Sequence, residues 1–164
     1  METTITRRYR FCASHRLHSA ALSEAENDRV YGKCNNPYGH GHDYMLDVAV
    51  AGDLNATTGI IVRTADLDRL VEAEVLAGFG YKNLNRDVAE FVELVPTTEN
   101  VALAIADRLR KHWRDYFPCS SARLSRISMQ ETERNSFEVV IAQSPGMPTP
   151  AALEVVNESV IVNA

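Results

Sequence analysis

The chain has 164 residues and a formal net charge of −5, from 17 Lys and Arg against 22 Asp and Glu. The length suits one domain, and 45% hydrophobic with 24% charged residues is typical of a soluble globular protein, not of a disordered one. The acidic balance argues against a nucleic-acid partner. No apolar run approaches the ~20 residues of a membrane span. Because the first residues lack the features of a signal peptide, we expect a cytoplasmic protein.

Two segments in the first third of the chain alternate as strands do. Residues 4–13 place Phe11 and other apolar residues on one face, and His15 continues that face just beyond the segment. Residues 42–51 alternate in the same way, with Tyr44 on the apolar side. We therefore predict two strands here.

Two helices are predicted next. Residues 65–77 carry apolar residues along one side, with Thr64 as the expected N-cap and Gly78 as the stop. Residues 98–115 repeat apolar residues at a spacing of four, with acidic residues early and basic residues late, as the helix dipole favours.

Residues 123–131 and 136–143 read as two more strands around a turn, a hairpin by pattern. The order predicts an α+β domain over residues 1–143, with a four-stranded antiparallel sheet and two helices on one face. Such a sheet, with apolar residues on both sides and free edges, invites assembly with copies of itself. Residues 144–164, rich in proline at their start, read as a C-terminal extension to which no chemistry is assigned.

Three histidines form the most informative pattern. His40 and His42 are two apart at the start of the second strand, so both imidazoles point to one side, and Gly41 between them removes bulk. His15, near the end of the first strand, supplies a third nitrogen if the two strand ends meet. Three histidines with an open fourth position are typical of catalytic zinc, and the alternative is three surface histidines in a polar loop.

The other histidines and the cysteines are weaker candidates. His18 lies in a loop, solvated or behind the site, and His112 fits a helix C-terminus. Cys34 lies six residues before His40, where a nearby dication would favour its thiolate, which makes it a possible base or nucleophile; the alternative is an incidental loop thiol. We interpret Cys12 and Cys119 as structural.

Two carboxylates are candidates for ligand binding. Glu131 ends the third strand and Glu99 begins the second helix. A carboxylate is the natural acceptor for a flat pair of N–H donors, such as the 2-amino-pyrimidinone edge of a pterin. Taken alone, either residue is more often a solvated charge or a helix-start residue.

Together these segments resemble the 6-pyruvoyltetrahydropterin synthase family over residues 5–143. The gap between Cys34 and His40 resembles this branch more than the 6-carboxytetrahydropterin synthases, whose gap is shorter. The resemblance is carried by residues 11–17, Gly32 to His42, Lys82-Asn83-Leu84-Asn85, Thr97-Thr98-Glu99-Asn100 and Glu131-Thr132.

The resemblance implies a tunnelling fold (T-fold), in which trimers close their sheets into a barrel and two trimers stack into a homohexamer with active sites between subunits. It implies a zinc-dependent lyase that converts 7,8-dihydroneopterin triphosphate to 6-pyruvoyltetrahydropterin, without a redox cofactor. Carried over to this chain, it assigns His15, His40 and His42 to zinc, Cys34 to catalysis, and Glu131 with Thr97, Thr98 and Glu99 to the pterin.

One segment departs from the family pattern. Where the family usually has Leu-Asp-His, this chain has Phe79-Gly80-Tyr81, so the Asp and His that relay protons with the cysteine are absent. Tyr81 has a hydroxyl that can donate a proton, but its ordinary pKa near ~10 makes it a poor base.

Three functions follow from this comparison. The first is a pterin-processing lyase with an altered proton relay. The second is an enzyme of the same fold with another outcome, either side-chain cleavage or formation of 6-carboxytetrahydropterin. The third is a zinc- and pterin-binding protein without catalysis.

Overall fold

The computed structural model describes residues 3–118 and 120–142. The expected extension over 144–164 and the thiol of Cys119 lie outside these residues. Among the helices in the described ranges, none is both long and apolar enough to cross a membrane.

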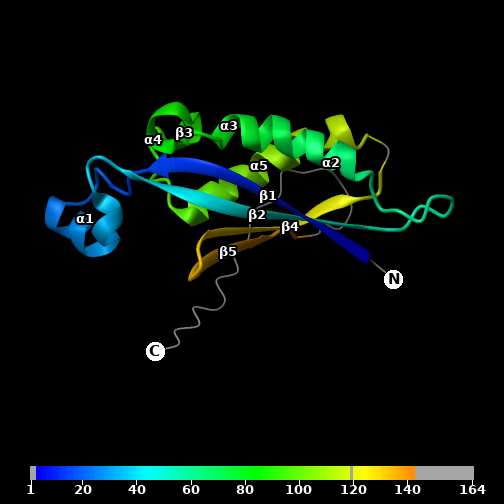
Figure 1. Cartoon of the computed structure of the whole chain (residues 1–164), viewed down its shortest axis with the longest axis horizontal. Helices are drawn as coiled ribbons and strands as arrows, with labels where there is room; N and C mark the ends of the chain where they lie inside the picture. The colour runs from blue at the N-terminus through cyan, green and yellow to red at the C-terminus, as the bar shows by residue number, and fades with distance from the viewer. Residues whose placement is uncertain (1–2, 119, 143–164) are drawn as a thin grey trace.

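One five-stranded sheet organises the chain, in the spatial order β3-β1-β2-β4-β5 (Figure 1). The pairs β1–β2, β2–β4 and β4–β5 are antiparallel, which confirms the predicted four-stranded sheet, and the two-residue β3 adds a parallel pairing to β1. The strands are β1 (Thr3–His15), β2 (His40–Gly52), β3 (Lys82–Asn83), β4 (Arg123–Thr132) and β5 (Asn135–Val140).

The helices include the two that were predicted and several short ones. The helix expected over 65–77 begins as α2, passes through the π-helical turn η2 and ends as α3. The helices of the described residues are α1 (Glu24–Tyr31), η1 (Gly32–Asn35), α2 (Thr64–Val71), η2 (Glu72–Leu76), α3 (Ala77–Phe79), α4 (Leu84–Asp87), η3 (Ala89–Phe91) and α5 (Thr98–Tyr116).

Two expected helix boundaries were wrong. Arg63, not Thr64, is the N-cap of α2, because the backbone carbonyl of Arg63 already accepts from Asp66 N and Leu67 N. Gly78 does not stop the helix, which continues to Phe79. A Cβ at position 78 would meet the guanidinium at the end of the Arg108 side chain, so a larger residue there would require Arg108 to move.

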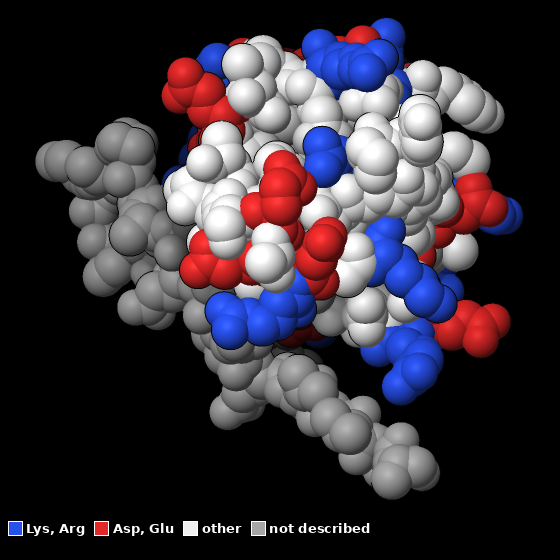
Figure 2. All heavy atoms as spheres, turned by 90° about the vertical axis from the view of Figure 1, so that its left-hand side faces the viewer, with Lys and Arg blue, Asp and Glu red and all other residues white. Residues whose placement is uncertain are grey.

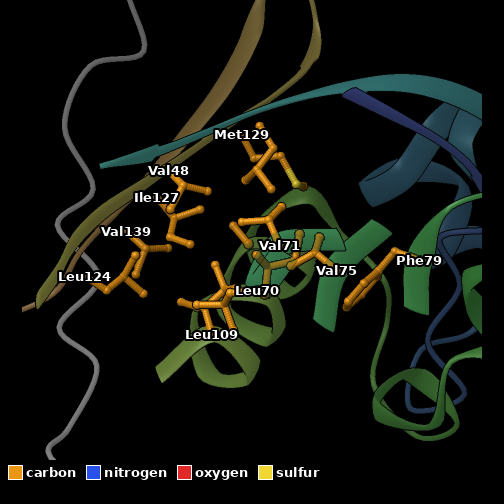
Figure 3. Close-up of a cluster of buried hydrophobic side chains, with 14 of the residues drawn as sticks. Val48, Leu70, Val71, Val75, Phe79, Leu109, Leu124, Ile127, Met129 and Val139 are labelled. Carbon is orange, nitrogen blue, oxygen red and sulfur yellow. The ribbon is translucent and has the colours of Figure 1, made fainter. Parts of the chain in front are cut away.

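The hydrophobic core lies between one face of the sheet and the helices α2 and α5. Figure 3 shows side chains of β2, β4 and β5 facing those of α2, η2 and α5 across this interface. We call this sheet surface the inner face. Many large side chains of the core, from both the sheet and the helices, are fully buried, among them Leu46, Leu67, Leu70, Leu109, Ile127 and Met129.

The opposite, outer face is more polar than expected. Arg8 pairs with Asp47 through two hydrogen bonds of 2.7 and 2.8 Å, and Arg10 pairs with Asp43. Apolar residues on both sides were predicted, and on β2 that holds for the small, buried Ala49 and Ala51. The middle of β1 contradicts the prediction, because alternation there puts arginines outward.

Candidate metal centre and active site

Three imidazoles come together where β1 ends and β2 begins. In the register of this antiparallel pair, His15 lies opposite His40, and Ala13 opposite His42. The potential ligand atoms of His15, His40 and His42 all lie within 4.8 Å of one another, and the ring centroids are 4.7–5.1 Å apart. Strand pairing therefore brings the three predicted ligands to one point.

Within residues 3–118 and 120–142, three nitrogens of these imidazoles have no hydrogen-bond partner. They are His15 Nε2, His40 Nδ1 and His42 Nε2, and each is buried. His15 Nδ1 lies 2.8 Å from the carbonyl oxygen of Pro96. Because a carbonyl only accepts, Nδ1 carries the proton and the lone pair of His15 is on Nε2. Buried polar atoms without partners are costly, so this arrangement fits a bound cation.

Burial keeps the imidazoles ready to bind an ion. The pKa of His15 is lowered mainly by burial, and the pKa of His40 is lowered by burial and then by the neighbouring His42. Metal ions bind the neutral imidazole, so these shifts reduce competition from protons near neutral pH. Three nitrogen donors suit zinc.

Glu131 and Tyr44 border the imidazoles. Glu131 Oε1 lies 3.6 Å from both His15 Nε2 and His42 Nε2, and the Glu131 side chain is 11% exposed. Tyr44 is fully buried, with its hydroxyl 3.4 Å from His15 Nδ1. Burial first, then the charges of Glu131 and Cys34, raise the pKa of Tyr44, so this phenol stays protonated. Sequence reasoning placed Tyr44 on the apolar face but missed its place beside the site, although the spacing 40, 42, 44 would have indicated it.

Cys34 lies in η1, close enough to Glu131 for their charges to interact. Burial, and then the carboxylate of Glu131, raise the pKa of the Cys34 thiol. The backbone of this turn is held firmly, since Leu17 N donates to the Cys34 carbonyl at 2.8 Å. In the absence of a cation, Cys34 is therefore a protonated thiol at neutral pH.

The neighbouring Asn35, which sequence reasoning missed, anchors the same turn. Its side chain is buried and its Oδ1 accepts from Arg16 Nη2 at 3.1 Å and lies 2.9 Å from His18 Nδ1. Its Nδ2 donates to Asp28 at 2.7 Å. His18 therefore contacts the residue next to Cys34.

The glycine that the site requires is Gly39, not Gly41. A Cβ at Gly41 would meet Ala13 O at an ordinary 3.6 Å, so an alanine fits there. Gly39 has a φ of +70°, and a Cβ would lie 2.8 Å from the backbone oxygen of His15. The expectation that Gly41 relieves crowding was wrong, because its missing side chain would point to the outer face.

The segment before α5 lies against the site through Pro96, whose carbonyl contacts His15. Thr97 is the N-cap of α5, with its hydroxyl accepting from Asn100 N at 3.3 Å. Thr98 is buried and Glu99 is exposed in the first turn. The predicted pterin-contact residues therefore follow directly on a residue that holds a histidine in place.

Tyr81 projects away from the molecule. Its side chain is 92% exposed, its φ is +57°, and its backbone N–H donates to Cys12 O at 2.6 Å. A left-handed conformation is uncommon for a residue with a side chain. Tyr81 lines a pocket of about 760 Å³ together with His42 and Asp43.

The remaining candidates lie outside the centre. His112 is on α5, 3.5 Å from Glu74 and 3.2 Å from Asp115. The thiol of Cys12 donates to Asp43 at 2.6 Å on the outer face, which agrees with a structural role. Figure 2 shows Lys and Arg interspersed with Asp and Glu on the face it draws, without a continuous basic stripe.

Comparison with known proteins places these residues in a family. Residues 4–141 match the family described as 6-pyruvoyl tetrahydropterin synthase. The chain is 46% identical over 110 residues to human 6-pyruvoyl tetrahydrobiopterin synthase, covering 67% of this chain and 76% of the human protein. The structure of 6-pyruvoyl tetrahydropterin synthase from Caenorhabditis elegans has a TM-score of 0.79 at 34% identity, over 87% of this chain and 97% of that one. A more distant relative, 33% identical over 100 residues (61% of this chain, 76% of the relative), is a dihydroneopterin monophosphate aldolase from Pyrococcus furiosus.

Proposed function

Because the chain belongs to the 6-pyruvoyl tetrahydropterin synthase family, we propose that it is a zinc-dependent lyase acting in tetrahydrobiopterin synthesis. It would eliminate triphosphate from 7,8-dihydroneopterin triphosphate and yield 6-pyruvoyltetrahydropterin. The observation that carries this proposal is the convergence of three partnerless imidazole nitrogens beside Glu131 and Cys34.

The metal would be held by His15, His40 and His42. Zinc accepts three histidine nitrogens in its catalytic sites, and when bound it polarises substrate oxygen atoms and acidifies adjacent positions. The residues around the histidines would hold the imidazole rings in the orientation that a metal requires. The Pro96 carbonyl holds the tautomer of His15, and the paired strands hold the other two rings.

The pterin would be anchored by Glu131, with Thr97, Thr98 and Glu99 next to it. A carboxylate accepts two N–H groups of a pterin edge in a bidentate manner. The low exposure of Glu131 favours this use, since hydrogen bonds to a charge are stronger away from water.

Cys34 would move protons at the substrate side chain. Its raised pKa keeps the free thiol protonated and so unable to accept a proton at neutral pH, and a cation beside it is needed to favour the thiolate. The fixed turn around Cys34 would keep the sulfur in one place during these transfers.

The proton relay would differ from that of the family. Position 80 does not accept a side chain, since a Cβ there would lie 2.5 Å from Leu76 O. Tyr81 would act as a proton donor in place of the absent histidine. Its exposed ring is suited to reach a site completed by another subunit.

The assembly would be a homohexamer of two stacked trimers, as the resemblance implies. Among the residues that the structure describes, β5 forms one edge of the sheet and β3 pairs with β1 only at Ala13 and Ser14, which leaves most of the outer edge of β1 unpaired. Open edges pair readily with strands of another copy.

Incubation with 7,8-dihydroneopterin triphosphate, followed by mass analysis of the products, tests the proposal. Release of triphosphate with the three-carbon side chain retained is the expected result. Loss of carbons would instead indicate side-chain cleavage, which the Pyrococcus furiosus relative makes a second candidate, or formation of 6-carboxytetrahydropterin. Pterin binding without turnover would indicate a zinc- and pterin-binding protein, and would contradict a lyase.

A further inference from the structure

Glu131 lies beside two of the three imidazoles. Its Oε1 is equidistant, at 3.6 Å, from the two nitrogens His15 Nε2 and His42 Nε2. This separation is too long for a hydrogen bond between nitrogen and oxygen, whose usual range ends near ~3.2 Å. The oxygen therefore lies beside the nitrogens without bonding to either.

The separation does match that of two ligands on one ion. Metal–ligand bonds of about 2.0–2.2 Å at tetrahedral angles put neighbouring ligand atoms about 3.3–3.5 Å apart. Glu131 Oε1 is close to that distance from two of the three histidine nitrogens.

Charge leads to the same conclusion. The ion-pair partners that the described residues offer Glu131 are His15 and His42, which are bases with neutral forms. A largely buried carboxylate is costly without a counter-charge. A divalent cation held by the histidines would supply that charge within bonding distance of the carboxylate.

We propose that Glu131 is the fourth ligand of the metal while no substrate is bound, closing the site with a carboxylate in place of water. The centre is then three histidines and one glutamate. This inference deepens the proposed function in one respect only: Glu131 exchanges the metal for the pterin when substrate arrives, so the fourth position opens only in the presence of pterin.

Cobalt replacement tests the ligand set without using activity. Metal-free protein is loaded with Co²⁺ alone, and its visible absorption is compared with that of Glu131→Gln. The wild-type protein should show the intense bands of four-coordinate cobalt with a carboxylate, and the variant should show shifted bands. Competition with a chelator should show a loss of at least about tenfold in metal affinity for Glu131→Gln, as expected when a ligand or its immediate support is removed.

Two variants serve as controls. Glu99→Gln removes an exposed carboxylate from the first turn of α5 and should leave the spectrum and affinity unchanged. Cys34→Ser tests the other potential ligand nearby and should also leave the bands in place. Spectra and affinities that are the same for wild type and Glu131→Gln, or bands that move only in Cys34→Ser, would overturn the proposal.

If Glu131→Gln does not fold, Glu131→Asp keeps the charge and retracts the oxygen by one methylene, and the bands should still shift.

Addition of 7,8-dihydroneopterin to the cobalt-loaded wild type should move its bands, and unchanged bands would refute the exchange. The first measurements use no pterin, so the two hypotheses can fail separately. Absence of turnover together with the Glu131 effect would contradict only the proposed function. Turnover without the Glu131 effect would contradict only the assignment of Glu131 as a metal ligand.

Discussion

Two regions of the inner sheet face are built from the same strands, but one is apolar and the other contains buried polar atoms that need a binding partner. In the apolar region, Leu46, Ile127 and Met129 are fully buried against the helices. At the end of the same strands, alternation continues through His40, His42 and Glu131, where buried nitrogens find no partner in the part of the chain that the structure describes. The first region is complete within one chain, whereas the second is arranged for something outside it.

The comparison teaches that stability and function have been separated along one surface. Core contacts depend on shape and apolar area, which any well-packed side chains can supply. At the polar end, by contrast, imidazole nitrogens that can bind a ligand lie close together. Substitutions in the two regions should therefore give opposite results.

Replacing a histidine at the polar end should have the largest effect on function. His40→Ala should abolish metal binding and activity, because two histidines no longer enclose the ion. Metal analysis of purified protein should show about one zinc per wild-type chain and none in the variant. His112→Ala should retain both properties, and unchanged turnover in His40→Ala would contradict the assignment.

A core substitution should lower the stability of the fold and leave metal binding unchanged. Leu109→Ala removes a fully buried side chain from α5 and should lower the free energy of unfolding by about 2–5 kcal/mol. Urea unfolding measures this loss. The folded variant should bind metal as wild type does, so a parallel loss of metal affinity would show that the two regions are coupled.

The exposed tyrosine tests the altered relay. Tyr81→Phe removes a hydroxyl without burying or exposing anything new, since the ring is 92% exposed. If Tyr81 donates a proton, product formation should slow by about 100-fold while pterin binding stays the same. Rapid-mixing kinetics and fluorescence titration separate the two, and equal rates for both proteins would exclude the role.

A paired charge behind the core should show the smallest effect. Glu90 accepts two hydrogen bonds from Arg108, at 2.6 and 2.7 Å, and these lower its pKa from the ordinary 4.5. A lowered pKa stabilises the fold above that ordinary value, and the contribution is lost as the pH falls through the folded pKa.

Glu90→Gln should therefore be less stable than wild type at neutral pH, by no more than about 1 kcal/mol for this partly exposed pair. The difference should shrink as the pH falls below the ordinary pKa and disappear below the lowered pKa of the folded state. Urea midpoints measured over this pH range provide the check, and a difference that does not change with pH would contradict the linkage.

Much of the fold was predictable because alternation and spacing are local. The four long strands and α5 follow from periods of two and about four, and their observed bounds differ from the predicted ones by a few residues. The short helix α1 was missed, although Ser23 and Glu26 form a capping box there, because its face is polar and it packs on a loop. β3 was missed because a strand of two residues is too short to show an alternating pattern.

The convergence of the three histidines was predictable, but their surroundings were not. His40 and His42 share a strand, so their common direction could be deduced, and His15 required only that two strands meet. The Pro96 carbonyl lies 81 positions along the chain from His15, and Asn35 acts through residues on separate elements. No local pattern connects such partners.

The sequence by itself determined the residue types of the centre, the alternation that directs them inward, and the helices that cover the sheet, because each depends on near neighbours in the chain. Only the tertiary structure decided that the nitrogens lack partners among the described residues, that Glu131 lies equidistant from two of them, and that the site requires a glycine at position 39. Those facts depend on distances between strands, which are established only when the β1–β2 and β2–β4 pairs form their register.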